Sequence, residues 1–185
     1  MRTISIIALL ILLCFGFSKN QTEVKITRNS EVIIKGKSNI NTFECRYNSD
    51  FIENELLVSV TKNPSKIVLE GAKIEINSNG FDCAHKMISK DFKTILKADA
   101  YPHILIDVKE ISTKKDNLTT KVVVKIAGVE NEYCVPTDFN QHNKSVKGNL
   151  KINIKDFKLK SPKKLLGLVV VDDYVEICFN LFLHY

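Results

Sequence analysis

The sequence has few of the side-chain groupings on which enzyme active sites depend. It contains no glycine-rich phosphate-binding loop. Its four histidines are scattered, and no serine, cysteine and histidine have a spacing that predicts a nucleophilic set. There is no C-x-x-C or H-x-x-x-H pattern, which argues against a zinc site. These absences predict a protein that is not an enzyme and that uses no cofactor or metal.

The positive charge is not arranged as nucleic-acid-binding proteins arrange theirs. The 27 Lys and Arg exceed the 21 Asp and Glu, which gives a net charge of +6. The lysines are spread along the chain instead of grouping on one face with interleaved aromatic residues, so they indicate a solvated outer surface. Internal repeats, low-complexity segments and interdomain linkers are also absent. We expect no nucleic-acid partner and one domain with a sizeable core.

Residues 1–18 predict a secretory signal peptide. Arg2 precedes an apolar run from Ile4 to Phe17, and small residues near Ser18 suit cleavage before Lys19. The run is shorter than the roughly 20 apolar residues that a membrane-spanning helix needs.

A lipoprotein is the alternative, because Cys14 lies in the apolar run. The preceding Ile11-Leu12-Leu13 lacks the small residues that lipoprotein processing prefers. We therefore expect the mature domain, residues 19–185, to be periplasmic or secreted and to have no stable membrane span.

Four cysteines remain after export, an even number that suggests disulfides in an oxidising compartment. Four cysteines allow three pairings, and we favour Cys45–Cys83 because both lie at the boundary of an apolar segment, beside Phe43 and Phe81. Cys134 and Cys178 lie opposite their strands' apolar rows. They form either a second bridge or two free thiols.

Most of the mature chain alternates apolar and polar residues with the period of a β-strand. In residues 146–155, Val146, Leu150, Ile152 and Ile154 alternate with lysines and asparagines. A strict period of two with lysines on the outer side predicts an antiparallel sheet with one wet face. The segment Leu56–Val60 is weaker and predicts an edge or lid strand.

About eight such strands predict a mainly β fold, an eight-stranded antiparallel barrel, since closure removes the exposed edges of a sheet. A β-sandwich shares these signals and is the alternative. One segment has helical spacing, with Phe92, Ile95 and Leu96 on one face. Ser89 suits its N-cap, and Tyr101-Pro102 suits its end. We expect this short helix near one opening of the barrel.

The inward-facing rows predict what the barrel would contain. They supply aliphatic and aromatic side chains with few polar groups, which suits an alkyl or isoprenoid chain. The same side chains could instead interdigitate and fill a dry core, and the residues alone leave both interpretations open. The predicted lining residues are Phe92, Ile95, Leu96, Ile104, Ile106, Val122, Val124, Ile126, Leu150, Ile152, Ile154, Ile177, Phe179 and Leu181.

Five segments form an ordered series, namely Gly36–Phe43, Phe81–Ile106, Val122–Val135 with its Ile126-Ala127-Gly128-Val129 hairpin, Gly148–Leu159 and Val169–Leu183. Taken in this order, they resemble the YceI-like family of bacterial periplasmic proteins. The resemblance implies a lipocalin-like barrel whose lumen holds a polyisoprenoid or a similar amphiphile. Many relatives carry an Arg-Asp…His-Leu run where this chain has His85–Asp91, so a head-group contact there is not carried over.

We therefore predict a binding protein that sequesters or carries a polyisoprenoid or another long-chain amphiphile. A filled-core barrel acting through its surface is the first alternative, and it would retain no hydrophobic dye. A barrel enzyme on an apolar substrate is the second. It needs an inward polar group, for which His103 and Tyr133 are the candidates. The sequence leaves open whether the protein forms a homodimer.

The first testable prediction concerns the inward row around Ile152. Placing a lysine there (Ile152→Lys) should block folding or abolish retention of a bound lipid, because an unpaired ammonium group is costly in an apolar interior. Circular dichroism reports folding and mass spectrometry of an organic extract reports lipid. If both are unchanged, the assignment of inner and outer faces is wrong.

Overall fold

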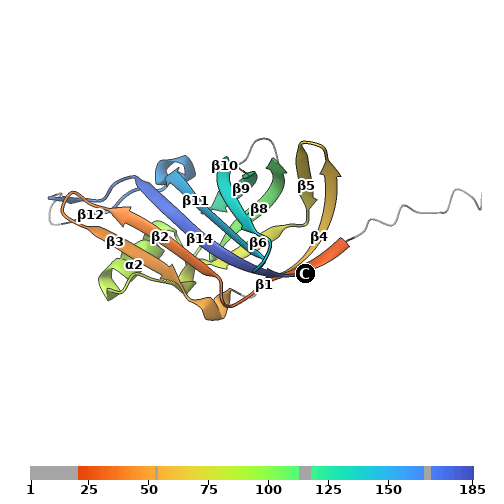
Figure 1. The fold of residues 1–185 in the computed structure, drawn as a ribbon. Coiled ribbons are helices and arrows are strands. Elements are labelled where there is room, and N and C mark those ends of the chain that lie inside the picture. Colours follow the sequence, from red (N-terminus) through yellow and green to blue (C-terminus); the bar gives the residue numbers. More distant parts are fainter. Residues whose placement is uncertain (1–20, 53, 113–117, 165–167) are drawn as a thin grey trace, which may run out of the picture.

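The structure is a computed structural model that describes residues 21–52, 54–112, 118–164 and 168–185. The predicted signal peptide, residues 1–18, lies outside these ranges. Most of the described chain is strand (Figure 1). The strands are β1 (Gln21–Ile26), β2 (Glu31–Lys37), β3 (Thr42–Tyr47), β4 (Asn54–Asn63), β5 (Lys66–Glu70), β6 (Lys73–Asn77), β7 (Phe81–Asp82), β8 (His103–Ser112), β9 (Leu118–Ile126), β10 (Val129–Asn140), β11 (Ser145–Asn153), β12 (Lys163–Lys164), β13 (Val169–Val170) and β14 (Tyr174–His184). The helices are η1 (Ser49–Phe51), η2 (Ser78–Gly80), α2 (Lys86–Ile95) and η3 (Ile154–Phe157).

Eight strands close into a ring in the order β1-β4-β5-β8-β9-β10-β11-β14, and β14 returns to β1. Every pairing between neighbours in this ring is antiparallel. The predicted eight-stranded antiparallel barrel is therefore confirmed, and the sandwich alternative is wrong. The prediction of an edge or lid strand at Leu56–Val60 is also wrong, because β4 lies inside the ring between β1 and β5.

Strand β14 pairs with two consecutive strands, β1 and β2, along the same edge. Near its end it pairs with β1, where Leu183 faces Ile26, and earlier it pairs with β2, where Ile177 faces Ile34. Between the two, the Phe182 amide donates to the Ser30 hydroxyl at 2.9 Å, and its carbonyl accepts from the backbone amide that follows β1. The chain can thus turn from β1 into β2 without leaving β14. Strands β2, β3 and β7 extend this wall beyond the ring (Figure 1).

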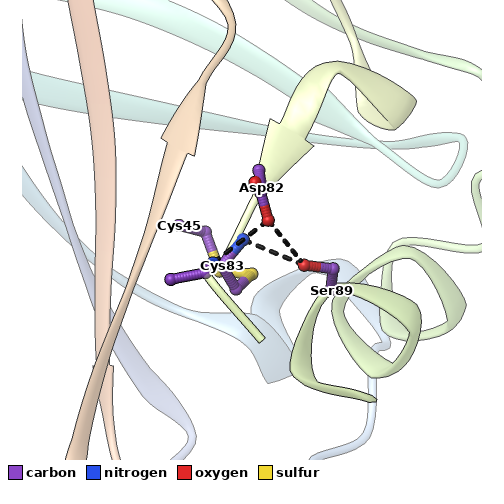
Figure 2. The surroundings of a disulfide bond; sticks show 5 residues. Cys45, Asp82, Cys83 and Ser89 are labelled. Atoms are coloured by element: carbon purple, nitrogen blue, oxygen red, sulfur yellow. Dashed lines mark hydrogen bonds between the residues drawn. A yellow bond between two sulfur atoms is a disulfide. The ribbon is translucent and has the colours of Figure 1, made fainter. Parts of the chain in front are cut away.

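The helix α2 begins earlier than the sequence suggested. Its N-cap is His85, whose Nδ1 accepts a hydrogen bond from the Met87 amide at 3.3 Å. Ser89 is not the N-cap, because its hydroxyl is engaged with the chain before the helix. It accepts from the Cys83 amide at 3.0 Å and donates to Asp82 Oδ1 at 3.1 Å (Figure 2).

The helix also ends before Tyr101-Pro102. Lys97 adopts a left-handed conformation with φ 53°, and the Ala98 amide then donates to the Lys93 carbonyl at 3.0 Å. This is the usual geometry of a helix C-terminus, occupied here by lysine where glycine is the common residue. The expected stop at Tyr101-Pro102 is therefore wrong, because the last helical residue is Ile95.

The Cys45–Cys83 disulfide is confirmed, and it joins β3 to the residues that lead into α2 (Figure 2). A row of rings runs beside it. The ring centroids of Tyr47 and Phe81 are 5.0 Å apart, and those of Phe81 and Phe92 are 5.3 Å apart. The disulfide and these rings together hold α2 against the barrel.

Cys134 and Cys178 are free thiols, so the second bridge is not formed. They lie on β10 and β14, and β11 separates these strands in the sheet. Burial raises the pKa of the Cys178 thiol, which keeps it protonated near neutral pH.

Removing the bridge with Cys45→Ala and Cys83→Ala should lower the free energy of unfolding by roughly 3–4 kcal/mol, because the bridge closes a long loop in the unfolded chain. The melting temperature should fall by roughly 6–16 °C. Urea and thermal unfolding with and without a reductant measure both effects. The matched control, Cys134→Ala with Cys178→Ala, should keep the wild-type response to reductant. Equal stability of the two double variants would contradict the assignment.

Candidate ligand cavity

The ring encloses a cavity of about 1190 Å³. This exceeds the roughly 300–1,000 Å³ of most small-molecule pockets. The barrel core is therefore not filled by interdigitated side chains. Inner side chains of β14, such as Ile177, Phe179 and Leu181, are only half-buried although they face the interior. An interior of this size can hold a long ligand.

All fourteen predicted lining residues lie on the wall of this cavity. Phe92, Ile95 and Leu96 reach it from α2, and the others reach it from β8, β9, β11, η3 and β14. Whether they contact a ligand stays a prediction. Several lining residues were missed although their strands show the same alternation, among them Val24, Ile26, Val32, Ile34, Val58, Ile74, Ile76 and Val135.

The cavity wall is almost entirely apolar. Lys62, Asp91 and Asp172 are the charged side chains that line it within the described part of the chain. The remaining polar lining groups are mainly hydroxyls and amides. A surface of this composition favours a hydrocarbon over a polar solute, because burying apolar area is favourable whereas burying unpaired polar groups is costly.

Buried residues of η3, of α2 and of the positions just after them line one end of the cavity. Phe157 is 0 % exposed, and Ile154, Leu159, Phe92 and Leu96 are also buried. Helix α2 therefore covers this end of the barrel, as expected from the sequence.

At the opposite end the lining residues are exposed. Val60 is 42 % exposed, Phe139 38 % and Tyr185 52 %. The register brings the β4–β5 and β10–β11 connections together with the end of β8 and the start of β9, because Lys66 pairs with Ser112 and Thr137 pairs with Leu118. We call this end the turn end.

The segment around Leu168 and Val170, after η3, lies beside the β2–β3 turn. The Asn39 side chain holds it by donating to the Leu168 carbonyl at 2.9 Å and accepting from the Val170 amide at 3.0 Å. A hydrogen bond from the Tyr174 amide lowers the pKa of Asp172, and Lys37 lowers it further. The Asp172 carboxylate is therefore ionised and already bonded to the protein.

Two glycines on the inner wall let aromatic rings lie flat against the sheet. The Phe179 ring covers Gly148, its partner across the β11–β14 pair, and the Phe43 ring covers Gly36 in the same way on β3 and β2. Any Cβ at either glycine would collide with the ring that covers it. The absence of two side chains therefore widens the cavity.

Tyr47 brings a hydroxyl to the wall, but that hydroxyl has a structural role. It accepts from the Asn77 amide at 3.0 Å and lies 3.4 Å from the Phe51 carbonyl, to which it donates. Burial raises the pKa of Tyr47, although the hydrogen bond from Asn77 opposes the shift. The phenol is thus neutral and fixed in place.

The two residues suggested for a barrel enzyme do not line the cavity. His103 is exposed at the start of β8. Tyr133 packs against Phe157 and donates to Asp156 Oδ2 at 3.2 Å, and burial with Asp156 raises the pKa of Tyr133 to about 12. The expectation of an inward polar group at either position is therefore wrong.

Two further features bear on the site. The described residues contain no group of three or more side chains that could hold a metal ion. None of their helices is long and apolar enough to cross a membrane.

These features define a β-barrel with an apolar lumen, a class of architecture suited to binding. The chain matches the YceI-like domain over residues 22–183 and belongs to that family. Two solved structures are similar. BcnA of Burkholderia cenocepacia has a TM-score of 0.62 and 20 % identity over 85 % of this chain and 97 % of its own. A polyisoprenoid binding domain of Saccharophagus degradans has a TM-score of 0.60 and 10 % identity over 89 % of this chain and 99 % of its own. A comparison with curated proteins found no match.

The lumen width at β14 yields a prediction. In Gly148→Val the new side chain should displace the Phe179 ring into the lumen and reduce uptake of a hydrophobic dye several-fold, at a cost of about 1–3 kcal/mol in stability. Dye titration and urea unfolding measure the two effects. Lys147→Val, on the outer face of the same strand, is the control. Unchanged uptake by folded Gly148→Val would show that the Phe179 ring does not limit the lumen.

Proposed function

We propose that this protein binds a polyisoprenoid or another long-chain amphiphile in its lumen. It sequesters or carries this molecule in the periplasm or after secretion, and it catalyses no reaction itself. The observation that supports this function is the cavity of about 1190 Å³ with an almost wholly apolar wall. The polar groups found on that wall are few, and those of Tyr47 and Asp172 are already bonded within the protein.

Hydrophobic burial alone can provide the affinity. Each methylene group transferred from water contributes about 0.8 kcal/mol, so ten of them contribute roughly 8 kcal/mol before the cost of association. The lumen therefore selects for chain length more than for any one chemical group. An isoprenoid suits it because methyl branches add apolar area to the chain.

Family membership supports the same function. The Saccharophagus degradans structure is described as a polyisoprenoid binding domain, and it shares the barrel over nearly its whole length. At 10 % identity, the likeness between the two chains supports a shared fold but does not identify the ligand. The choice between an isoprenoid and an unbranched chain therefore needs a direct measurement.

Mass spectrometry of an organic extract of the mature protein, purified from its native compartment, tests the proposal. We expect one long-chain molecule in a ratio near one per protein. An empty extract, together with no dye uptake by the folded protein, would contradict the proposal.

A pair of neighbouring variants tests where the ligand binds. Leu150 faces the lumen and Lys151 faces outward on the same strand. Leu150→Trp should reduce dye uptake at least several-fold because the indole occupies lumen volume, whereas Lys151→Trp should leave it unchanged. Fluorescence titration measures uptake, and thermal unfolding confirms that both variants fold. Equal effects of the two substitutions would place the dye outside the barrel.

A further inference from the structure

The inner row of β4 ends in a lysine. Strand alternation turns every second residue of β4 toward the lumen, and all five residues of this row line the cavity. Four of them are uncharged, and the fifth, at the turn end, carries a positive charge. The row consists of Asn54, Leu56, Val58, Val60 and Lys62.

The neighbours of Lys62 across the sheet are apolar. Lys62 pairs with Ile67 on β5, and Ile67 pairs with Ile111 on β8. Both isoleucines also line the cavity. The next residue in this register is Thr120 on β9, whose hydroxyl lies 2.7 Å from that of Thr137. These described neighbours of Lys62 across the sheet therefore supply no carboxylate.

Lys62 differs in this respect from several lysines on the outer face. Lys66, at the other side of the same hairpin, lies 2.7 Å from Glu110, and Lys121 lies 2.9 Å from Glu132. Among the residues that the structure describes, Lys62 has no ion pair. The acidic lining residues belong to other parts of the wall, since Asp91 is on α2 and Asp172 is bound by Lys37.

Lys144, a second lysine at the turn end, is bonded within the protein. Its Nζ donates to the Tyr185 backbone oxygen at 3.3 Å and lies 4.5 Å from the centre of the Tyr185 ring. Among the described residues that line the cavity, Lys62 is the one lysine or arginine. An ammonium group beside apolar walls interacts more strongly with an anion than it would in open water.

We propose that Lys62 binds the acidic head group of the amphiphile at the turn end, while its hydrocarbon chain extends through the lumen toward α2. The head group is a carboxylate or a phosphate. This inference rests on the proposed function and adds to it the chemical class and the direction of the ligand. Lys62 determines specificity, whereas the apolar wall provides most of the affinity.

Two probes that differ only in charge test this assignment, namely cis-parinaric acid and its methyl ester, titrated by fluorescence at pH 8. Lys62→Met keeps the length of the side chain and removes its charge. We expect it to weaken binding of the acid about five- to tenfold and to leave the ester within about twofold. Lys62→Arg should bind both probes as the wild type does.

Lys147→Met is the matched control, because Lys147 is exposed on the outer face of β11 at the same end and has no ion pair among the described residues. It should bind both probes like the wild type. Equal weakening of the acid by Lys62→Met and Lys147→Met would overturn the assignment, since it would reflect net charge. Equal weakening of acid and ester by Lys62→Met would also overturn it, since it would reflect packing.

Competition identifies the head group. Palmitate and geranylgeranyl phosphate are each compared with the matching alcohol for displacement of the bound methyl ester. The acid whose advantage over its alcohol disappears in Lys62→Met carries the preferred head group, and no advantage for either acid would overturn the proposal. A wild-type protein that takes up neither fluorescent probe would instead refute the lumen-binding function itself.

Discussion

The antiparallel pairing of β14 is the constraint on which the rest of the structure depends. This strand pairs with β11 along one edge and with β1 and β2, one after the other, along its second edge. In the connection between β1 and β2, the Ser30 hydroxyl accepts a hydrogen bond from the Phe182 amide. Without this bond, a partly buried donor would be left unpaired at the seam of the barrel. Closure of the ring, and therefore the lumen, follows from this continuous edge.

The disulfide and α2 complete the enclosure on the side that the ring leaves open. Strand β3 belongs to the extension beyond the ring, and Cys45 bonds it to Cys83 just before the helix (Figure 2). A second pocket of about 420 Å³ lies at this junction and shares Phe43 and Ile88 with the main cavity. The disulfide thus joins β3 to the chain before α2 at a place where the side chains do not fill the wall completely.

The period of two could be read from the sequence and predicted the barrel and the inner rows, whereas the position of both cysteines at apolar boundaries favoured the Cys45–Cys83 pair. Local details that depend on distant contacts could not be read from the sequence. Ser89 has the composition of an N-cap, yet Asp82 and the Cys83 amide engage its hydroxyl. Lys97 carries no sign of a left-handed conformation. Strand β4 carries an outward-facing leucine, Leu57, which is 61 % exposed. This leucine weakens the alternation of apolar and polar residues, so the segment was wrongly predicted to be an edge or lid strand. The width of the cavity depends on the position of the Phe179 ring over Gly148, which the alternation of apolar and polar residues does not predict.

The distribution of polar groups supports the proposal that this barrel binds a ligand and catalyses no reaction. Asp173 is bonded to Lys155 and Ser161, which lower its pKa, and Tyr47 holds the Asn77 amide. A catalytic group needs a free lone pair or proton directed at a substrate, but these groups use theirs to fix loops and strands around the lumen. Lys62 is different, because its charge lies at the rim of the apolar wall with no carboxylate beside it among the described residues. A single cation placed there can orient a ligand without altering it, since the bonds of the hydrocarbon chain meet only inert side chains.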